Sequence, residues 1–307
     1  MSQGLSKNSV RILNPTGLLP RGMSDFAKMV QQKRCFVDKS LLIQEILHCD
    51  DDVVLITRPR RFGKTINMSM LRCFFEIPSN NESRSISHPF DNLLVTQHQE
   101  IMQHQGKYPV IALTFKDVKE SSWQYTYEKL RSVINKEIDQ HPESKEFEIA
   151  GFGDEERRQW QRILSSDEAT VNDWKSSLQL LCKLLTLHHK QAPWIFLDEY
   201  DTPIHTAYLQ SKKEQEEIDS ASSYYNQMIT FMRGLLGTAL KGNDVYLHKA
   251  VITGILRVGK EDIFSDLNNL GVYGVMDDRF SQFFGFTTPE VQQLLQQRKL
   301  QHAFPSV

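Results

Sequence analysis

One short apolar run constrains the fold of this chain more than any other feature. Residues Val53–Thr57 read VVLIT, are rich in β-branched side chains, and are flanked by charged residues. A continuous apolar run of this length is typical of a strand covered on both faces, as in a parallel sheet. Over residues 64–76 the hydrophobic period changes to that of a helix. The sequence therefore predicts a buried strand that leads through a short loop into a helix.

Apolar runs and helical patterns alternate along the rest of the chain. We expect further strands at Pro109–Phe115, Trp194–Leu197 and Lys249–Thr253, with a last short one at Phe283–Phe286. We expect helices within 24–48, with Ser24 and Asp38 as caps, and at 121–139, 171–187 and 214–240, and an exposed charged insertion at 140–170. This alternation predicts an α/β fold with a mostly parallel central sheet flanked by helices. Its strand ends and loops would gather at one edge, where ligands bind in such sheets.

The loop after the first strand carries a phosphate-binding pattern. Its second half matches G-x-x-x-x-G-K-[ST], although an arginine replaces the first glycine; the residues are Arg58, Pro59, Arg60, Arg61, Phe62, Gly63, Lys64 and Thr65. A glycine lets the backbone curl round a phosphate, and the N–H groups at the start of the helix favour the negative charge. Lys64 can reach the β- and γ-phosphates, and the Thr65 hydroxyl can bind Mg²⁺. The three arginines suit phosphate oxygens. A chance GKT tripeptide, or an arginine patch that docks nucleic acid or acidic protein, is the alternative.

Two carboxylates follow the apolar strand Trp194–Leu197. We assign Asp198 to the metal, because Mg²⁺ is commonly held by a carboxylate through part of its hydration shell. Glu199 can orient the attacking water or take its proton. On the next apolar strand, Thr253 could sense the γ-phosphate, and Arg257 could pair with phosphate oxygens. The plainer interpretation of these residues is a polar turn, a strand-end threonine and a surface arginine.

Composition excludes several classes of protein. The formal net charge of −2 gives no general attraction to nucleic acid or to acidic membranes, although a local basic patch stays open. The start of the chain lacks the apolar run of a signal peptide, and no stretch has the ~18 apolar residues of a membrane span. The four cysteines have no zinc-ligand spacing and predict reduced thiols. We therefore expect a cytoplasmic protein without a membrane partner.

Together these stretches resemble a known family, the AAA-ATPase-like proteins, a set of AAA-related P-loop NTPases. The resemblance runs from about Leu19 to Phe286 and rests on LPRGMSDF, CFVDKSLL, VLITRPRRFGKT, YPVIALTFKD, WIFLDEYDTPI, ITGILRVGKEDIFSDLNNL and FFGFT. It implies an AAA-type sheet, ATP and Mg²⁺ as ligands, and an ATP site that includes Lys64, Thr65, Asp198 and Glu199. It also implies that Ser24–Phe26 and Val37–Lys39 pack near the nucleotide, and it matches Asp201 without assigning it a role.

The resemblance divides the chain and leaves three functions open. We expect a loosely ordered N-terminus at 1–18, the ATPase-like domain at 19–287, and at 288–307 the start of a helical region. Similar proteins continue there into a helical lid, and many carry a restriction-endonuclease-like domain, so we expect the lid to be largely absent. The first function is ATP hydrolysis that drives a conformational change, with a protein partner or self-assembly. The others are a nucleotide-binding module with little activity and a DNA-associated accessory protein.

Overall fold

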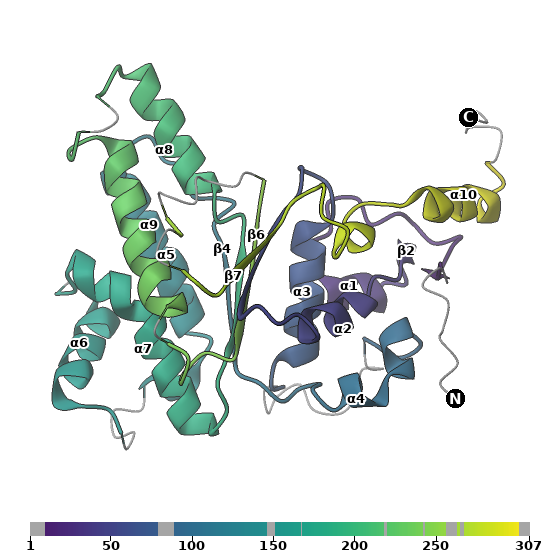
Figure 1. Ribbon diagram of the computed structural model, residues 1–307, viewed down its shortest axis with the longest axis horizontal. Coiled ribbons are helices and arrows are strands. Elements are labelled where there is room, and N and C mark those ends of the chain that lie inside the picture. Colours follow the sequence, from purple (N-terminus) through teal and green to yellow (C-terminus); the bar gives the residue numbers. More distant parts are fainter. Residues whose placement is uncertain are drawn as a thin grey trace.

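A five-stranded, wholly parallel sheet forms the centre of the molecule (Figure 1). The computed structural model describes residues 10–78, 89–145, 151–166, 168–217, 220–241, 243–255, 263–264 and 267–300. The strand order is β4-β5-β6-β3-β7, with β4 at Val110–Thr114, β5 at Trp194–Asp198, β6 at Lys249–Gly254, β3 at Val53–Thr57 and β7 at Leu270–Tyr273. The α/β fold with a parallel sheet is therefore confirmed, and the strand that precedes the predicted phosphate loop lies inside the sheet.

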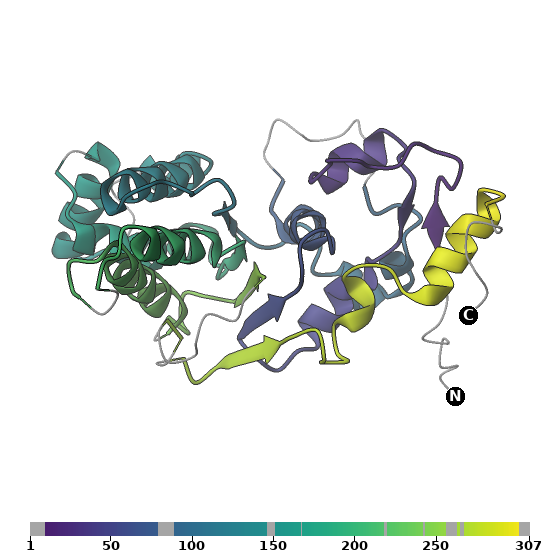
Figure 2. The same ribbon diagram turned by 90° about the horizontal axis from the view of Figure 1, so that it is seen from above.

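Helices cover both faces of this sheet, as the view from above also shows (Figure 2). On one face lie α1 (Phe26–Gln31), α2 (Leu41–Leu47) and α3 (Lys64–Phe75). On the other lie α5 (Trp123–Ile138), α6 (Asp154–Ser165), α7 (Val171–His189), α8 (Thr202–Lys213) and α9 (Tyr224–Leu240). The described chain also contains the short α4 (Gln99–Met102), α10 (Thr288–Gln297) and an antiparallel pair of β1 (Ile12–Leu13) with β2 (Phe36–Val37).

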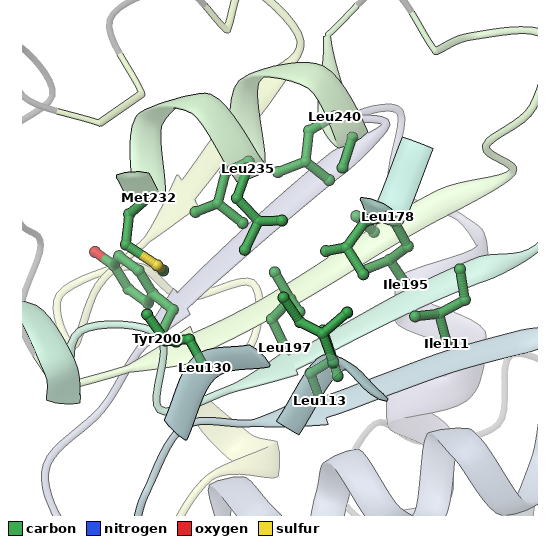
Figure 3. Close-up of a cluster of buried hydrophobic side chains, with 14 of the residues drawn as sticks. Ile111, Leu113, Leu130, Leu178, Ile195, Leu197, Tyr200, Met232, Leu235 and Leu240 are labelled. Carbon is green, nitrogen blue, oxygen red and sulfur yellow. The ribbon is translucent and has the colours of Figure 1, made fainter. Parts of the chain in front are cut away.

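Alternate residues of the inner strands enter two separate hydrophobic cores. In β3, Val53 and Leu55 face the core beneath α5, α7 and α9, whereas Val54 and Ile56 face the core beneath α1, α2 and α3. Figure 3 shows part of the first core, where Leu197 of β5 lies among side chains from the neighbouring strands and helices. Burial on both faces explains why Val53–Ile56 are all apolar, with the polar Thr57 at the end of the strand.

Two expected elements are wrong. No strand forms at Phe283–Phe286, where Ser281–Phe283 makes a single 3₁₀ turn, and the fifth strand is β7 instead. Its four residues include a glycine and lie half-buried at the sheet edge, so they lack the apolar signal of the inner strands. The helix expected at 214–240 starts later, as α9 at Tyr224, because the Ser223 hydroxyl caps it by accepting from the N–H of Asn226. The helix before it, α8, ends at Lys213 and was not expected.

The stretch 140–170 is also more ordered than we expect from its charge. Its DEERR run is the first turn of α6, and this helix buries Trp160, whose Nε1 donates to the Ser144 carbonyl at 2.8 Å. Acidic residues favour a helix N-terminus, so the charge pattern indicates a helix start rather than an irregular insertion. The predicted caps are displaced as well: Asp25, not Ser24, accepts the N–H of Lys28, and α2 starts after Ser40.

Within the stretch 1–18, Ile12 and Leu13 form β1 and pair with Val37 and Phe36 of β2. None of the four cysteines, all in the described part of the chain, forms a disulfide. Among the described residues, no helix combines the length and apolarity that crossing a bilayer requires.

A cluster of two histidines and two glutamates joins the end of α5 to α7. His141 Nε2 lies 3.5 Å from Glu137 Oε1, and His141 Nδ1 lies 3.6 Å from Glu143 Oε1. Glu143 also accepts from His189 Nε2 at 2.9 Å. Burial lowers the pKa of His141, but the two carboxylates outweigh it and raise that pKa to about 9. His141 is therefore a cation in the folded protein at neutral pH.

Candidate functional site

The loop between β3 and α3 turns sharply at Gly63. This residue is the N-cap of α3 and has a φ of +78°, in the left-handed region that favours glycine. A Cβ at this position would meet only the Ile66 side chain, at 3.6 Å. The glycine therefore supplies backbone freedom rather than room. The turn leaves the first N–H groups of α3 at the loop, as an anion site at a helix N-terminus requires.

Lys64 places its ammonium group on the loop that precedes it. Its Nζ donates to the carbonyls of Arg58 and Pro59, both at 3.0 Å, and its side chain is buried. Burial lowers the pKa of Lys64, while the charges of Glu199 and Asp198 oppose that shift. The Lys64 ammonium group is therefore held on the loop and lies within the field of the acids at the end of β5.

Asp198 at the tip of β5 joins the loop to two strands. Its Oδ2 accepts from Thr65 Oγ1 at 2.7 Å, and its Oδ1 accepts from Thr253 Oγ1 at 2.6 Å. Both Asp198 and Thr253 are buried. The strand order explains this meeting, because β6 lies between β3 and β5 and the three parallel strands end at the same edge. Thr253 contacts the carboxylate, so in this arrangement it orients Asp198.

Glu199 stands next to Asp198 in an unusual backbone conformation. Its φ is +53°, and Thr202 Oγ1 donates to its Oε2 at 3.2 Å. Among the acids that oppose the lowered pKa of Lys64, Glu199 has the largest effect. The structure therefore brings the five predicted residues Lys64, Thr65, Asp198, Glu199 and Thr253 to one edge of the sheet.

The Arg58 side chain bonds to backbone carbonyls at the ends of two strands. Its Nη1 donates to the carbonyls of Thr57 at 2.9 Å, Tyr273 at 2.9 Å and Gly274 at 2.6 Å. Its guanidinium carbon lies 5.5 Å from the centre of the Phe284 ring. Burial lowers the pKa of Arg58, and the charge of Asp277 opposes this. Arg58 thus anchors the start of the loop to the end of β7.

The four loop residues that follow Arg58 are exposed, unlike Arg58 itself. Pro59, Arg60, Arg61 and Phe62 are exposed, so their side chains are accessible to a ligand or partner. Arg257 lies outside the described residues.

Sequence reasoning missed a C-terminal segment, Gln282–Gly285, that packs on the loop. The N–H of Gly285 donates to the Phe62 carbonyl at 2.9 Å, and Asn67 Nδ2 donates to the Phe283 carbonyl at 2.9 Å. We call this segment the C-terminal clasp. The sequence FFGFT, which includes most of this segment, contributes to the family resemblance. Within it, Gly285 is the residue that could have indicated a turn, and its φ is +82°.

The N-terminal stretches implied by the resemblance lie against the same elements. The N–H of Phe26 donates to Ser69 Oγ of α3 at 3.0 Å. Lys39 Nζ donates to the carbonyl of Gln282 and to Glu290 Oε1, both at 2.5 Å. These stretches therefore pack on α3 and on the C-terminal clasp.

The oxygen atoms at the sheet edge fit one hydrated Mg²⁺ ion rather than a cation bound only by protein. One carboxylate, Asp198, and one hydroxyl, Thr65, lie 2.7 Å apart. Across the described part of the chain, no group of three or more His, Cys, Asp or Glu side chains could hold a metal. Mg²⁺ commonly keeps several waters and uses one or two carboxylates together with substrate phosphates. The donor set is therefore of the kind that Mg²⁺ uses beside a nucleotide.

Comparison with known proteins gives the family of the chain. The family described as predicted AAA-ATPase matches residues 20–264 of the 307, a range that includes the loop, Asp198, Glu199 and Thr253. No curated protein and no solved structure matched the chain. Because the match covers well over half of the sequence, the chain belongs to the AAA-ATPase-like family.

Proposed function

We propose that this protein binds ATP with Mg²⁺ at the loop Arg58–Thr65 and hydrolyses it. The observation that carries the proposal is the 2.7 Å hydrogen bond between Thr65 Oγ1 and Asp198 Oδ2. It joins the residue after the loop lysine to the carboxylate at the tip of another strand. A magnesium ion bound to a nucleotide needs these two oxygens side by side.

The phosphates would lie in the curve of the loop, against the N-terminus of α3. Main-chain N–H groups at Gly63 and beyond, together with the helix dipole, favour the negative charge there. Lys64 now donates to two loop carbonyls, and a phosphate oxygen would replace them as acceptor. Arg60 and Arg61 are exposed beside the loop and can add charge.

Thr65 and Asp198 would hold the metal, and Thr253 would keep the Asp198 carboxylate oriented. Bound Mg²⁺ would neutralise charge on the phosphate oxygens. Glu199 would accept a hydrogen bond from the attacking water and take its proton. Its closeness to Lys64 supports this role, because the lysine marks the end of the phosphate chain.

We further propose that turnover changes the conformation of the C-terminal clasp. The clasp is bonded to the Phe62 carbonyl, within the phosphate loop, and to Asn67, in the first turn of the helix that follows it. A loop that closes round a phosphate must either carry these contacts with it or break them. Movement of the clasp would then reach α10, which follows it directly in the chain.

Phosphate release from Mg²⁺-ATP tests the proposal. We expect the Lys64→Ala variant to lose about 100-fold or more in kcat, as when one charge-stabilising donor is removed. The matched control is Lys129→Ala, which removes an exposed lysine of α5 and should keep the wild-type rate. Thr65→Ala should weaken the dependence on Mg²⁺.

Two outcomes would decide against hydrolysis. Equal rates in the wild type and in Lys64→Ala would show that any activity comes from a contaminant. An increase in Tm with ATP, but without phosphate release, would instead indicate a binding module with little activity, because a ligand bound by the native state stabilises it.

A further inference from the structure

The turn between β5 and α8 is tied to the end of β6 by three hydrogen bonds. Asp198 Oδ1 accepts from Thr253 Oγ1 at 2.6 Å, and the N–H of Tyr200 donates to the Thr253 carbonyl at 3.1 Å. The third bond runs from the N–H of Ile255 to Asp201 Oδ2, at 2.9 Å. The turn that carries Glu199 is therefore held by β6 on both sides of that residue.

The Asp201 carboxylate accepts a hydrogen bond from the segment after β6 and none from the first turn of its own helix, α8. It is the N-cap of α8, where an aspartate normally accepts an N–H of the first turn, but its side chain makes no capping bond. The residue is only 2% exposed. A buried carboxylate is costly unless its oxygens are hydrogen-bonded, and the Ile255 N–H supplies one such bond.

The packing between the turn and β6 leaves no room for a side chain at Gly254. A Cβ there would lie 2.7 Å from Tyr200 Cε1 and 2.9 Å from Asp201 Oδ1. Tyr200 is completely buried and cannot move aside without disturbing the core. The close approach of the two segments is therefore a built feature, and Asp201 is part of it.

Glu199 lies between the residues that are bonded to β6, and its own backbone conformation is strained. Glu199 has a φ of +53°, a conformation that a residue with a side chain adopts at a cost in energy. Such conformations persist only when the surrounding structure fixes them, and they gather at functional sites. The bonds from Asp198, Tyr200 and Asp201 to β6 supply that restraint.

We propose that Asp201 is a positioning residue, whose hydrogen bond from the Ile255 N–H locks the turn onto β6 and so holds Glu199 towards the phosphate loop. The proposal rests on the proposed ATP hydrolysis, for which Glu199 acts on the attacking water. Asp201 itself would touch neither substrate nor metal. Its loss would therefore act on the chemical step, with little effect on nucleotide binding.

Two variants separate the hydrogen bond from the charge. Asp201→Ala removes the acceptor, whereas Asp201→Asn removes the charge and keeps a carbonyl oxygen that can accept from Ile255. We expect Asp201→Ala to lower kcat for Mg²⁺-ATP by about tenfold or more, because small displacements of a catalytic group are that costly. KM should change by less than about threefold, since ground-state binding is intact. Asp201→Asn should keep kcat within about threefold of the wild type.

Amide hydrogen exchange at Ile255 and Tyr200 provides a readout that needs no turnover. We expect faster exchange at both amides in Asp201→Ala and wild-type protection in Asp201→Asn. If the wild type itself releases no phosphate, the proposed hydrolysis fails, and the exchange pattern alone still decides whether Asp201 locks the turn.

Three results would overturn the inference. One is wild-type kcat in a folded Asp201→Ala protein, and another is unchanged exchange at Ile255 in that variant. The third is an equal loss of kcat in Asp201→Ala and Asp201→Asn, which would assign the effect to the negative charge. If Asp201→Ala does not fold, the Asn variant decides by itself. A loss of kcat above about tenfold, with a normal thermal transition, would refute the lock.

Discussion

Gly285 tests whether the C-terminal clasp positions the phosphate loop. Its φ is +82°, and its N–H donates to the Phe62 carbonyl at 2.9 Å. An alanine Cβ at this position would lie 3.0 Å from Phe62 Cδ1 and 3.2 Å from Phe62 Cε1. The substitution Gly285→Ala therefore strains the clasp backbone and pushes on a side chain of the loop at the same time.

The expected cost has two parts. A left-handed alanine costs roughly 1–2 kcal/mol relative to glycine. The tight contact adds up to about 1 kcal/mol, because the half-exposed Phe62 ring can move partly aside. At about 2–4 °C per kcal/mol for a large domain, this cost of about 1–3 kcal/mol should lower the Tm of Gly285→Ala by roughly 2–12 °C. If about 1 kcal/mol of the strain is relieved by displacement of the loop, ATP should bind about fivefold more weakly.

Gly22→Ala is the matched control, because Gly22 has a φ of +68° and nothing within 4 Å of an added Cβ. It should lower Tm by the conformational cost alone and leave ATP affinity unchanged. Thermal unfolding and equilibrium ATP titration of both variants give the comparison. If Gly285→Ala binds ATP as the wild type does, the clasp does not position the loop, whatever its effect on Tm.

Two further predictions concern stability away from the site. His141 has a folded pKa of about 9 against an ordinary 6.5, so its contribution, at most about 3 kcal/mol, is complete below pH 6.5 and is lost as pH rises through 9. Urea unfolding of His141→Gln at pH 6, 7.5 and 9 should remove this decline, and a decline as steep as that of the wild type would contradict it. In α9, Gly237→Ala should stabilise by about 0.5–1 kcal/mol, because nothing lies within 4 Å of the new Cβ. Gly234→Ala should gain less by calorimetry, since its Cβ would lie 2.6 Å from Lys175 Cδ.

The sequence predicts the positions of the buried strands best. The inner strands β3, β5 and β6 are covered on both faces, so each has a continuous apolar run with polar residues only towards its ends. The meeting of Thr65 with Asp198 also followed from the sequence, because parallel strands end at a common edge. The half-buried edge strand β7 carries no such signal, so the strand predicted at Phe283–Phe286 starts 13 residues after the start of β7 at Leu270.

Contacts made by backbone atoms between distant segments were beyond sequence reasoning. The C-terminal clasp depends on the Phe62 and Phe283 carbonyls, and any residue has a carbonyl. The role of Asp201 depends in the same way on the N–H of Ile255. Residue types can mark a glycine or a carboxylate as unusual, but the partner in each case is set by the tertiary fold alone.

Arg58 shows why the chain can form this loop although an arginine replaces the first glycine of the pattern G-x-x-x-x-G-K-[ST]. The backbone residues with positive φ in this loop are Arg61 and Gly63, and Arg58 is not among them. Its position therefore needs no glycine, and its side chain points away from the loop curve towards the carbonyl ends of β3 and β7. Carbonyls at the end of a strand attract a cation, and Phe284 covers the guanidinium on one face. The arginine thus fixes the loop to the edge strand, and the proposed phosphate site would depend on Gly63 and the N-terminus of α3 instead.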